Sequence, residues 1–347
     1  MDSLSKPEQD TDLEYYWGID IGGTQIKIGL VDAIGNTHFR TSIETNELAG
    51  PDSAMDRIAE VMGQFEASTS DSPRADAIGI GAPGPMDLTS GMLVEPPQLP
   101  SWRHYAIVDE IKRRTGRHVS FQNDANAAAY GEFWLGSGQE HQSMLLLTLG
   151  TGVGGGIVID GELANGANSF AGEVGHMIVN PAPDARLCIW GGGRGQLEAY
   201  GSASAVSMLA EEKLRQGITS CLNDHFSGSQ GTVSAKDVYD AARRDDALAL
   251  EIIDETAKWL GIGVTSLTHT VDPGAVVLGG AMNFGGNDCP IGQRFLHGIT
   301  EEFRRHTFDS VFAGTSIKFA SLGSDAGYLG AAGYARKEYN SRVRLNH

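Results

Sequence analysis

Residues 16–31 read YWGIDIGGTQIKIGLV, and this stretch decides the fold. Two β-rich runs, YWGIDI and QIKIGLV, flank the short turn Gly22-Gly23-Thr24. Their composition predicts two strands joined by a glycine turn. Residues 144–159, MLLLTLGTGVGGGIVI, repeat the strand–glycine turn–strand pattern. The repeat predicts two similar mixed α/β halves, with ligand bound between them.

Further elements follow each repeat. Apolar residues at helical spacing predict a helix over about 53–67, a helix that stops at Gly116, and a long helix over 247–271. ADAIGIGA and GAVVLGG are predicted as buried strands. The polar stretch 216–234 is predicted to be a loop of unassigned role. The expected organisation is a disordered tail (1–14), an N-terminal half (15–132), a C-terminal half (133–325) and a C-terminal helix (326–347) that packs back on the first half.

Composition limits the class of protein. The 347 residues include 46 glycines, about twice the usual share of roughly 7%, without a period of three, so we expect the excess in tight turns and loops. The 44 acidic and 26 basic residues give a net charge of −18, which disfavours nucleic acid and anionic membrane as partners. An anionic ligand must then be held locally, by backbone N–H groups or a metal.

Cysteine usage and hydropathy bear on the compartment. The three cysteines are too few for a disulfide framework and fit a reducing environment. The polar, acidic N-terminus lacks the features of a signal peptide, and no stretch of 18 apolar residues is present. A cytoplasmic location without a membrane span is therefore expected.

The first glycine turn is a candidate phosphate site. Gly22 and Gly23 allow backbone N–H groups to face a phosphate, and Thr24 adds a hydroxyl. Asp20, at the end of the preceding strand, is placed to hold a hydrated Mg²⁺. The alternative is a plain β-hairpin turn.

The second glycine turn matches G-x-G-x-x-G at Gly150, Gly152 and Gly155. A dinucleotide site requires a helix after this loop, whereas the strand-like IVID follows here. The better interpretation is a second phosphate-facing turn that mirrors the first.

Asp124 lies between a predicted strand and an alanine-rich helix, in QNDANAAAYGE. A carboxylate there serves either as a simple N-cap or as a general base for a hydroxyl that attacks phosphorus. A third group contains Glu173, His176 and Glu198, which together are able to grip vicinal hydroxyls. Glu173 and His176 are three apart, so one helical turn would put both on one side. His176 with Cys188 also suggests part of a zinc site, and a structural histidine is the third option.

Seven elements in this order resemble the ROK family of sugar kinases, from about Trp17 to Arg336. They are DIGGTQIK (20–27), GIGAPGP (79–85), QNDANAAAYGE (122–132), LGTGVGGG (149–156), AGEVGH (171–176), VVLGGAM (276–282) and SDAGYLGAAG (324–333). The resemblance implies an actin-like ATPase fold, α/β, with two ribonuclease H-like domains and a cleft between them.

The resemblance also implies roles for individual residues. Asp124 would be the catalytic base. The sugar would be held by Gly84, Asn123, Asp124, Glu173, His176 and Glu198. ATP, with Mg²⁺, would contact Asp20, Gly22, Gly23, Thr24, Lys27, Thr151 and Gly152, with Gly279 and Gly280 near adenosine.

The chain departs from the family at one place. Many members carry C-x-C-G-x-x-G-C-x-E, whose three cysteines join the histidine on zinc. Here residues 188–198 read CIWGGGRGQLE, one residue longer, with Gln196 in the last cysteine slot and Trp190 or Gly191 in the middle one. At most one cysteine ligand survives, so we expect no structural zinc and a loop held by packing and hydrogen bonds.

The resulting hypothesis is an ATP- and Mg²⁺-dependent hexokinase that phosphorylates the 6-hydroxyl, foremost a glucokinase, and the family suggests a homodimer. Alternatives are a kinase for fructose, mannose or an N-acetylhexosamine, a polyphosphate-dependent kinase, and a non-catalytic sugar-binding regulator. A repressor would need a DNA-binding domain, for which the roughly 16 residues before the first strand are too few.

Overall fold

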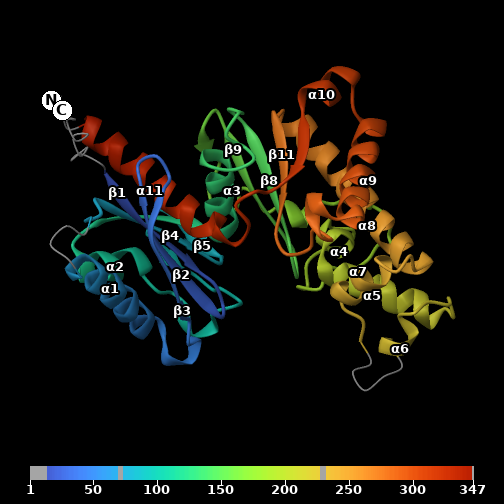
Figure 1. Ribbon diagram of the computed structural model, residues 1–347, viewed down its shortest axis with the longest axis horizontal. Coiled ribbons are helices and arrows are strands. Elements are labelled where there is room, and N and C mark those ends of the chain that lie inside the picture. The colour runs from blue at the N-terminus through green and yellow to red at the C-terminus, as the bar shows by residue number, and fades with distance from the viewer. Residues whose placement is uncertain (1–13, 69–72, 227–231, 346–347) are drawn as a thin grey trace, which may run out of the picture. The chain divides into compact units, whose positions relative to one another are not determined.

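The computed structural model describes residues 14–68, 73–226 and 232–345, which divide into two compact units (Figure 1). One unit holds the chain up to Ala127 and again from Gly327, and the other runs from Ala128 to Ala326. The first boundary lies inside helix α3 (Asp124–Trp134), and the second at the start of helix α11 (Ala326–Leu345). The sequence-based boundary, after residue 132, lies in the same helix α3. The tail expected over residues 1–14 falls outside the described residues except for Glu14.

The first unit is built on a five-stranded sheet with the order β3–β2–β1–β4–β7. The β1–β2 and β2–β3 pairs are antiparallel, whereas β1–β4 and β4–β7 are parallel. The strands are β1 (Tyr15–Ile21), β2 (Gln25–Asp32), β3 (Thr37–Glu44), β4 (Ala77–Ala82) and β7 (His118–Asn123). A ribbon of β5 (Met86–Asp87) and β6 (Met92–Leu93) follows β4.

The second unit repeats this arrangement, with the order β10–β9–β8–β11–β12. Here too, two antiparallel pairs are followed by two parallel pairs. The strands are β8 (Met144–Leu149), β9 (Val153–Ile159), β10 (Glu162–Leu163), β11 (Ala275–Gly279) and β12 (Ser316–Phe319). The duplication predicted from residues 16–31 and 144–159 is therefore confirmed.

Helices cover both sheets. The first unit contains α1 (Pro51–Ala67) and α2 (Ile107–Thr115), and α2 ends at Gly116 (φ 69°) as predicted, because the left-handed cap favours glycine. The second unit contains α4 (Glu198–Gly201), α5 (Ala203–Arg215), α6 (Asn223–Phe226), α7 (Ala235–Ala242), α8 (Ala247–Val271), α9 (Pro290–His306) and α10 (Asp309–Gly314). The short helix α6 corrects the loop expected over 216–234, of which residues 227–231 lie outside the described part.

The two faces of the first sheet pack differently because successive residues of a strand point to opposite sides. Trp17, Ile19 and Ile21 lie in the core with buried residues of α1 and α2, such as Met55 and Ile111. The second unit has its own core, in which β8 and β11 pack with apolar residues of α5, α8 and α9. Each unit thus buries an apolar core of its own.

The other face of the first sheet lies against the backbone of α11. A Cβ at Gly18 would stand 1.9 Å from the Tyr328 carbonyl oxygen, and one at Gly79 1.8 Å from that of Ala331. Such distances are incompatible with any side chain at either strand position. The expectation that the glycine excess sits in turns and loops was therefore wrong in part: some glycines lie inside strands to admit a helix backbone.

Among the described residues, no helix is both long enough and apolar enough to cross a membrane.

Candidate active site

The first glycine turn joins β1 to β2 as predicted. The Gly22 N–H closes the turn on the Gln25 carbonyl at 2.9 Å, and the Thr45 hydroxyl donates to the Gly22 carbonyl at 2.6 Å. Gly23 and Thr24 are exposed at the tip. The turn is therefore held in place by the hydrogen bonds of Gly22, and its exposed tip is accessible to a ligand.

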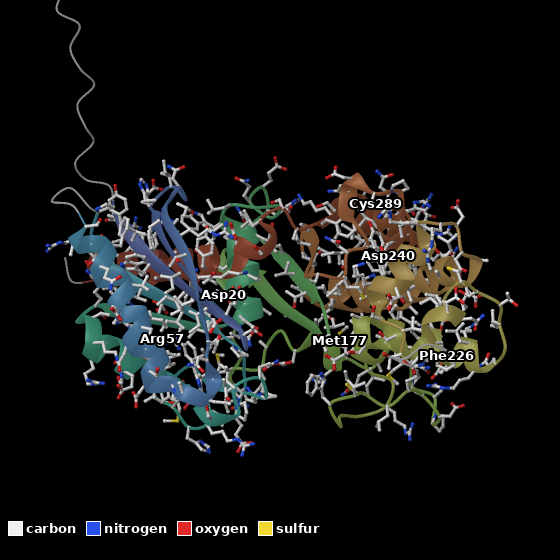
Figure 2. The ribbon with its side chains drawn as sticks, turned by 60° about the horizontal axis from the view of Figure 1, so that its bottom comes forward. Asp20, Arg57, Met177, Phe226, Asp240 and Cys289 are labelled. Atoms are coloured by element: carbon white, nitrogen blue, oxygen red, sulfur yellow. The ribbon has the colours of Figure 1, made fainter. Side chains whose placement is uncertain are left out.

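Asp20 lies at the end of β1, on the face that packs against α11 (Figure 2). A Cβ at Gly327, in the first turn of α11, would lie 2.5 Å from the Asp20 carboxylate, so glycine gives the carboxylate its room. Lys27 Nζ lies 3.9 Å from Asp20 Oδ2. Burial raises the pKa of Asp20, and the Lys27 charge opposes that rise in part.

Asp124 is the first residue of α3 and is exposed. Its Oδ1 accepts a hydrogen bond from the Ala125 N–H at 2.8 Å, and Asn123 Oδ1 accepts from the same N–H at 2.9 Å. A Cβ at Gly84 would lie 3.4 Å from Asn123 Nδ2. The structure thus brings Gly84, Asn123 and Asp124 together at the ends of β4 and β7, with the carboxylate oriented by the helix start.

The second glycine turn joins β8 to β9 and contacts the start of α5. The Gly150 carbonyl accepts a hydrogen bond from the Ala203 N–H at 2.8 Å, and the Thr151 carbonyl accepts from the Ser204 hydroxyl at 2.8 Å. The N-terminus of a 13-residue helix therefore lies at this turn. Such a helix end favours a negatively charged ligand.

Glu198 is buried and lies against the same turn. Its Oε2 accepts a hydrogen bond from the Val153 N–H at 3.0 Å, and its Oε1 accepts from the Cys188 thiol at 3.1 Å. A Cβ at Gly152 would lie 2.2 Å from Glu198 Oε2. A side chain at position 152 would therefore have to displace this buried carboxylate.

Glu173 is the N-cap of a 3-10 helix (Val174–His176) that ends at His176, and His176 Nε2 lies 3.8 Å from Glu173 Oε2. The prediction that one turn puts both on one side is confirmed. Both side chains are about half exposed, and His176 Nδ1 lies 3.3 Å from Gln196 Oε1. The backbone N–H of Leu197 donates to the Met177 carbonyl at 2.8 Å, which ties the Glu173–His176 segment to the one that carries Glu198.

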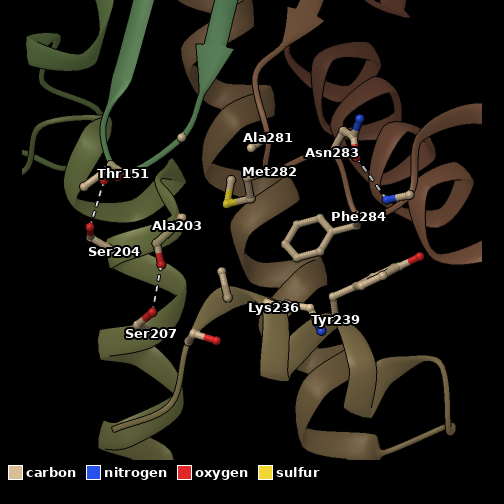
Figure 3. Close-up of a pocket in the computed structure, with 14 residues that line it drawn as sticks. Thr151, Ala203, Ser204, Ser207, Lys236, Tyr239, Ala281, Met282, Asn283 and Phe284 are labelled. Atoms are coloured by element: carbon tan, nitrogen blue, oxygen red, sulfur yellow. Dashed lines mark hydrogen bonds between the residues drawn. The ribbon is translucent and has the colours of Figure 1, made fainter. Parts of the chain in front are cut away.

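A cavity of ≈ 610 Å³ opens in the second unit beside the second glycine turn (Figure 3). The residues that line it come from the turn, α5, α7 and the segment after β11. They are Gly150, Thr151, Ala203, Ser204, Ser207, Ser234, Ala235, Lys236, Tyr239, Ala281, Met282, Asn283, Phe284 and Gly285. Of the predicted nucleotide residues in this unit, Thr151 lines the cavity, whereas Gly152, Gly279 and Gly280 do not.

Gly280 instead shapes the chain that forms one wall. It has φ 90°, and a Cβ there would lie 2.2 Å from the Leu149 carbonyl oxygen. The same carbonyl accepts a hydrogen bond from the Met282 N–H at 2.9 Å. The close approach brings the segment after β11 to the end of β8, beside the second turn.

Sequence reasoning missed the wall contributed by α5 and α7. A signal for α7 was present, because the Ser234 hydroxyl accepts from the Asp237 N–H at 3.2 Å and Asp237 Oδ2 accepts from the Ser234 N–H at 2.9 Å. This capping box is readable in Ser234-Ala235-Lys236-Asp237 and marks a helix that starts directly after the stretch 216–234, which was predicted to be loop. No local pattern links Tyr239 to Phe284, whose ring centroids lie 6.5 Å apart.

Comparisons with known proteins agree with these features. The model of the ROK family matches residues 16–338. The glucokinase of Halalkalibacterium halodurans is 34% identical over 334 residues, which cover 96% of this chain and 98% of that protein. The glucokinase of Thermotoga maritima is 36% identical over 316 residues, 91% of this chain and 95% of that protein.

A solved structure gives the same result. A ROK family glucokinase from Streptomyces griseus, in complex with glucose and AMPPNP, aligns with a TM-score of 0.70 and 33% identity over 94% of this chain and 99% of that one. Its match, together with the two equivalent five-stranded sheets, identifies the actin-like ATPase fold with two ribonuclease H-like units. The chain belongs to the ROK family.

Proposed function

We propose that this protein is an ATP-dependent glucokinase, which transfers the γ-phosphoryl group of ATP to the 6-hydroxyl of glucose. One observation carries the proposal furthest: Glu198, a candidate sugar ligand, accepts a hydrogen bond from Val153 at the end of a glycine turn that borders a ≈ 610 Å³ cavity. Elements suited to a sugar and to a nucleotide are thus joined within one unit. The glucokinases among the relatives support glucose as the sugar.

The cavity is the proposed site of adenosine. Its volume falls in the range of roughly 300–1,000 Å³ that is usual for small-molecule sites. The phosphates would extend toward Thr151 and the start of α5, where the helix dipole and the backbone N–H groups favour negative charge. The first turn, with Gly22, Gly23, Thr24 and Lys27, is proposed to contact the phosphates as well.

The residues proposed to bind the sugar are Glu173, His176 and Glu198, together with Gly84 and Asn123. Carboxylates and an imidazole accept hydrogen bonds from hydroxyl groups, and charge-assisted bonds of this kind are short and directional. Glu198 uses one lone pair of each oxygen inside the protein, so each oxygen retains capacity for a hydroxyl.

Asp124 is proposed as the general base. The 6-hydroxyl oxygen attacks the γ-phosphorus, the bond from that phosphorus to the β–γ bridging oxygen breaks, and ADP leaves with the electron pair. The hydroxyl proton goes to the Asp124 carboxylate. The Ala125 N–H, 2.8 Å from Oδ1, orients this carboxylate. Mg²⁺ would enter with ATP and neutralise phosphate charge, and Asp20, a carboxylate beside an accessible glycine turn, is the residue proposed to hold it through water.

A coupled ADP-release assay with Mg²⁺-ATP tests the proposal against glucose, mannose, fructose, N-acetylglucosamine and N-acetylmannosamine. We expect the highest kcat/KM for glucose. A higher value for another sugar would keep the kinase and replace the substrate. Sugar binding without turnover of any sugar would overturn the proposal in favour of a sugar-binding regulator.

We also propose a cytoplasmic location in glucose metabolism, where ATP and free hexose are available, and a homodimer. The sparse cysteines are consistent with a reducing compartment. Light scattering after size exclusion would measure the oligomeric state directly.

A further inference from the structure

Residues 188–198 differ from the metal-binding pattern of the family. Where that pattern has cysteines on zinc, this chain has Gln196 and a tryptophan–glycine stretch. Among residues 14–68, 73–226 and 232–345, no group of three or more His, Cys, Asp or Glu side chains is placed to hold a metal ion. His176 and Cys188 have other partners, Gln196 and Glu198. The residues present therefore do not fit a structural zinc ion.

Backbone pairing brings Gln196 to His176. The Val179 N–H donates to the Gly195 carbonyl at 2.8 Å, and Ile178 forms a β-bridge with Gln196. Met177, labelled in Figure 2, continues this pairing through its carbonyl. The segment that follows His176 thus runs antiparallel to the segment that carries Gln196, without any need for a metal.

Space for the Gln196 amide comes from the glycine run. A Cβ at Gly192 would lie 2.6 Å from Gln196 Oε1, and a Cβ at Gly193 3.6 Å from its Nε2. The amide therefore lies over this run, with its oxygen 3.3 Å from His176 Nδ1. If Nδ1 carries the ring proton, it donates to this amide oxygen, and Nε2, which lies 3.8 Å from Glu173 Oε2, is left as an acceptor for a hydroxyl.

Cys188 holds Glu198, the other proposed sugar-binding residue, in a similar way. It is buried, 1% exposed, and its thiol donates to Glu198 Oε1. With the Val153 N–H on Oε2, Glu198 is held at both oxygens.

We propose that Gln196 and Cys188 are positioning residues of the sugar site, which hold His176 and Glu198 by hydrogen bonds in place of a metal. The proposal rests on the proposed function, since it assumes that His176 and Glu198 bind the sugar. Gln196 and Cys188 do not touch the reacting atoms. They therefore affect sugar affinity and leave phosphoryl transfer to other groups.

Gln196 is tested with two variants of similar length. Gln196→Met removes the acceptor, and we expect the glucose KM to rise about three- to tenfold, the share of one hydrogen bond, with kcat and the ATP KM nearly unchanged. Gln196→Glu keeps an acceptor oxygen and should retain most of the glucose affinity. Gln139→Ala, an exposed glutamine of the same unit, is the matched control. An unchanged glucose KM in Gln196→Met would overturn the role.

A double-mutant cycle separates positioning from a general effect on the fold. In a His176→Ala background, Gln196→Met should add little to the glucose KM, because its only route to the sugar is already lost. Full additivity would contradict the proposal. Thermal unfolding of each variant shows whether the comparison concerns folded protein.

Cys188 is tested by Cys188→Ala and Cys188→Ser. Loss of the donor in the alanine variant should raise the glucose KM by a similar factor, and the serine hydroxyl should restore it. Equal glucose KM values in the alanine variant and the wild type would remove Cys188 from the role.

Metal content gives an independent readout. The purified protein should contain far less than one zinc per chain by elemental analysis, and dialysis against EDTA should leave the glucose KM unchanged once Mg²⁺ is restored. Stoichiometric zinc, with loss of glucose affinity on removal, would overturn the proposal. Absence of sugar turnover in the wild type would instead overturn the proposed function, so the two failures are distinguishable.

Discussion

The Val153 N–H donates to Glu198 Oε2 at 3.0 Å, and this bond joins a candidate sugar residue to the strand that leaves the second glycine turn. The carboxylate comes so close to the turn that a Cβ at Gly152 would lie 2.2 Å from the same oxygen. Gly152 thus serves the placement of Glu198, a role that a phosphate-binding turn alone does not require.

Gly152→Ala should therefore weaken sugar binding as well as nucleotide binding. The methyl group displaces a buried carboxylate that has two hydrogen-bond partners, so we expect the glucose KM to rise at least about tenfold. Steady-state kinetics with each substrate varied in turn measures this. Gly314→Ala, with no atom within 4 Å of its Cβ, is the control. A variant in which only the ATP KM changes would contradict the role assigned to Gly152.

Asp124→Asn tests the general base. Asparagine keeps an oxygen that accepts from the Ala125 N–H, so the start of α3 is preserved while the base is lost. We expect kcat to fall about 10²–10⁴-fold, with glucose binding by calorimetry nearly unchanged. Asp309→Asn removes an exposed carboxylate at the same position of another helix, α10, and should behave as the wild type. Turnover near the wild-type rate in Asp124→Asn would leave this residue as a helix cap only.

Ser207→Trp tests the cavity. Ser207 lies on α5 and faces the cavity, so an indole there occupies the space proposed for adenosine (Figure 3). The ATP KM should rise more than about tenfold, because overlap with a bound ligand cannot be relieved in a packed wall. Met208→Trp, the next residue along the helix and exposed, is the matched control. Unchanged ATP affinity in Ser207→Trp would show that the nucleotide binds elsewhere.

Asp20→Asn should separate stability from activity. Since burial raises the pKa of Asp20, the ionised carboxylate costs folded-state free energy at neutral pH. The variant should be more stable at pH 7, and this gain should vanish as the pH falls below the unfolded-state pKa of about 3.9. Denaturant unfolding at several pH values measures it.

The same variant should lose activity, with kcat/KM for ATP reduced at least about tenfold if Asp20 holds Mg²⁺ as proposed. A variant that is both fully active and no more stable would contradict the two roles together.

For Asp32 we expect the opposite pH dependence of folding stability. Burial raises the pKa of this carboxyl, but hydrogen bonds from His38 and Asn36 outweigh burial and lower it. The stabilisation is therefore complete above the unfolded-state pKa of about 3.9 and is lost as the pH falls through the lower folded-state value. Asp32→Ala should cost about 1–3 kcal/mol at pH 7, and less in acid, by chemical denaturation. Asp184→Ala, at an exposed aspartate, should show no such pH-dependent loss.

Local patterns in the sequence predicted the parts of the fold that local forces determine. The glycine turns at Gly22 and Gly150 lie between strands because the flanking residues are β-rich over short distances. The capping position of Asp124 was predicted for the same reason. In each case the decisive neighbours are within a few residues along the chain.

Other features depend on contacts distant in sequence. Gly18 is a glycine because of Tyr328, and the role of Gly152 depends on Glu198. The cavity wall draws on residues near 204, 236 and 283, and none of these segments shows a pattern that names the others. Such partners become visible only when the sheet topology is known, since register and helix placement decide which side chains meet.

The close fit of Gly18 and Gly79 against α11 bears on the order in which the chain acquires structure during synthesis. Residues 128–326 form a continuous unit that has all its parts before the last helix is made. The first unit, although translated earlier, lacks the cover of one sheet face until residues 327–345 leave the ribosome. The unit that starts first is thus completed last, and a truncation before Gly327 should uncover one face of the first sheet while it leaves every residue of the second unit in the chain.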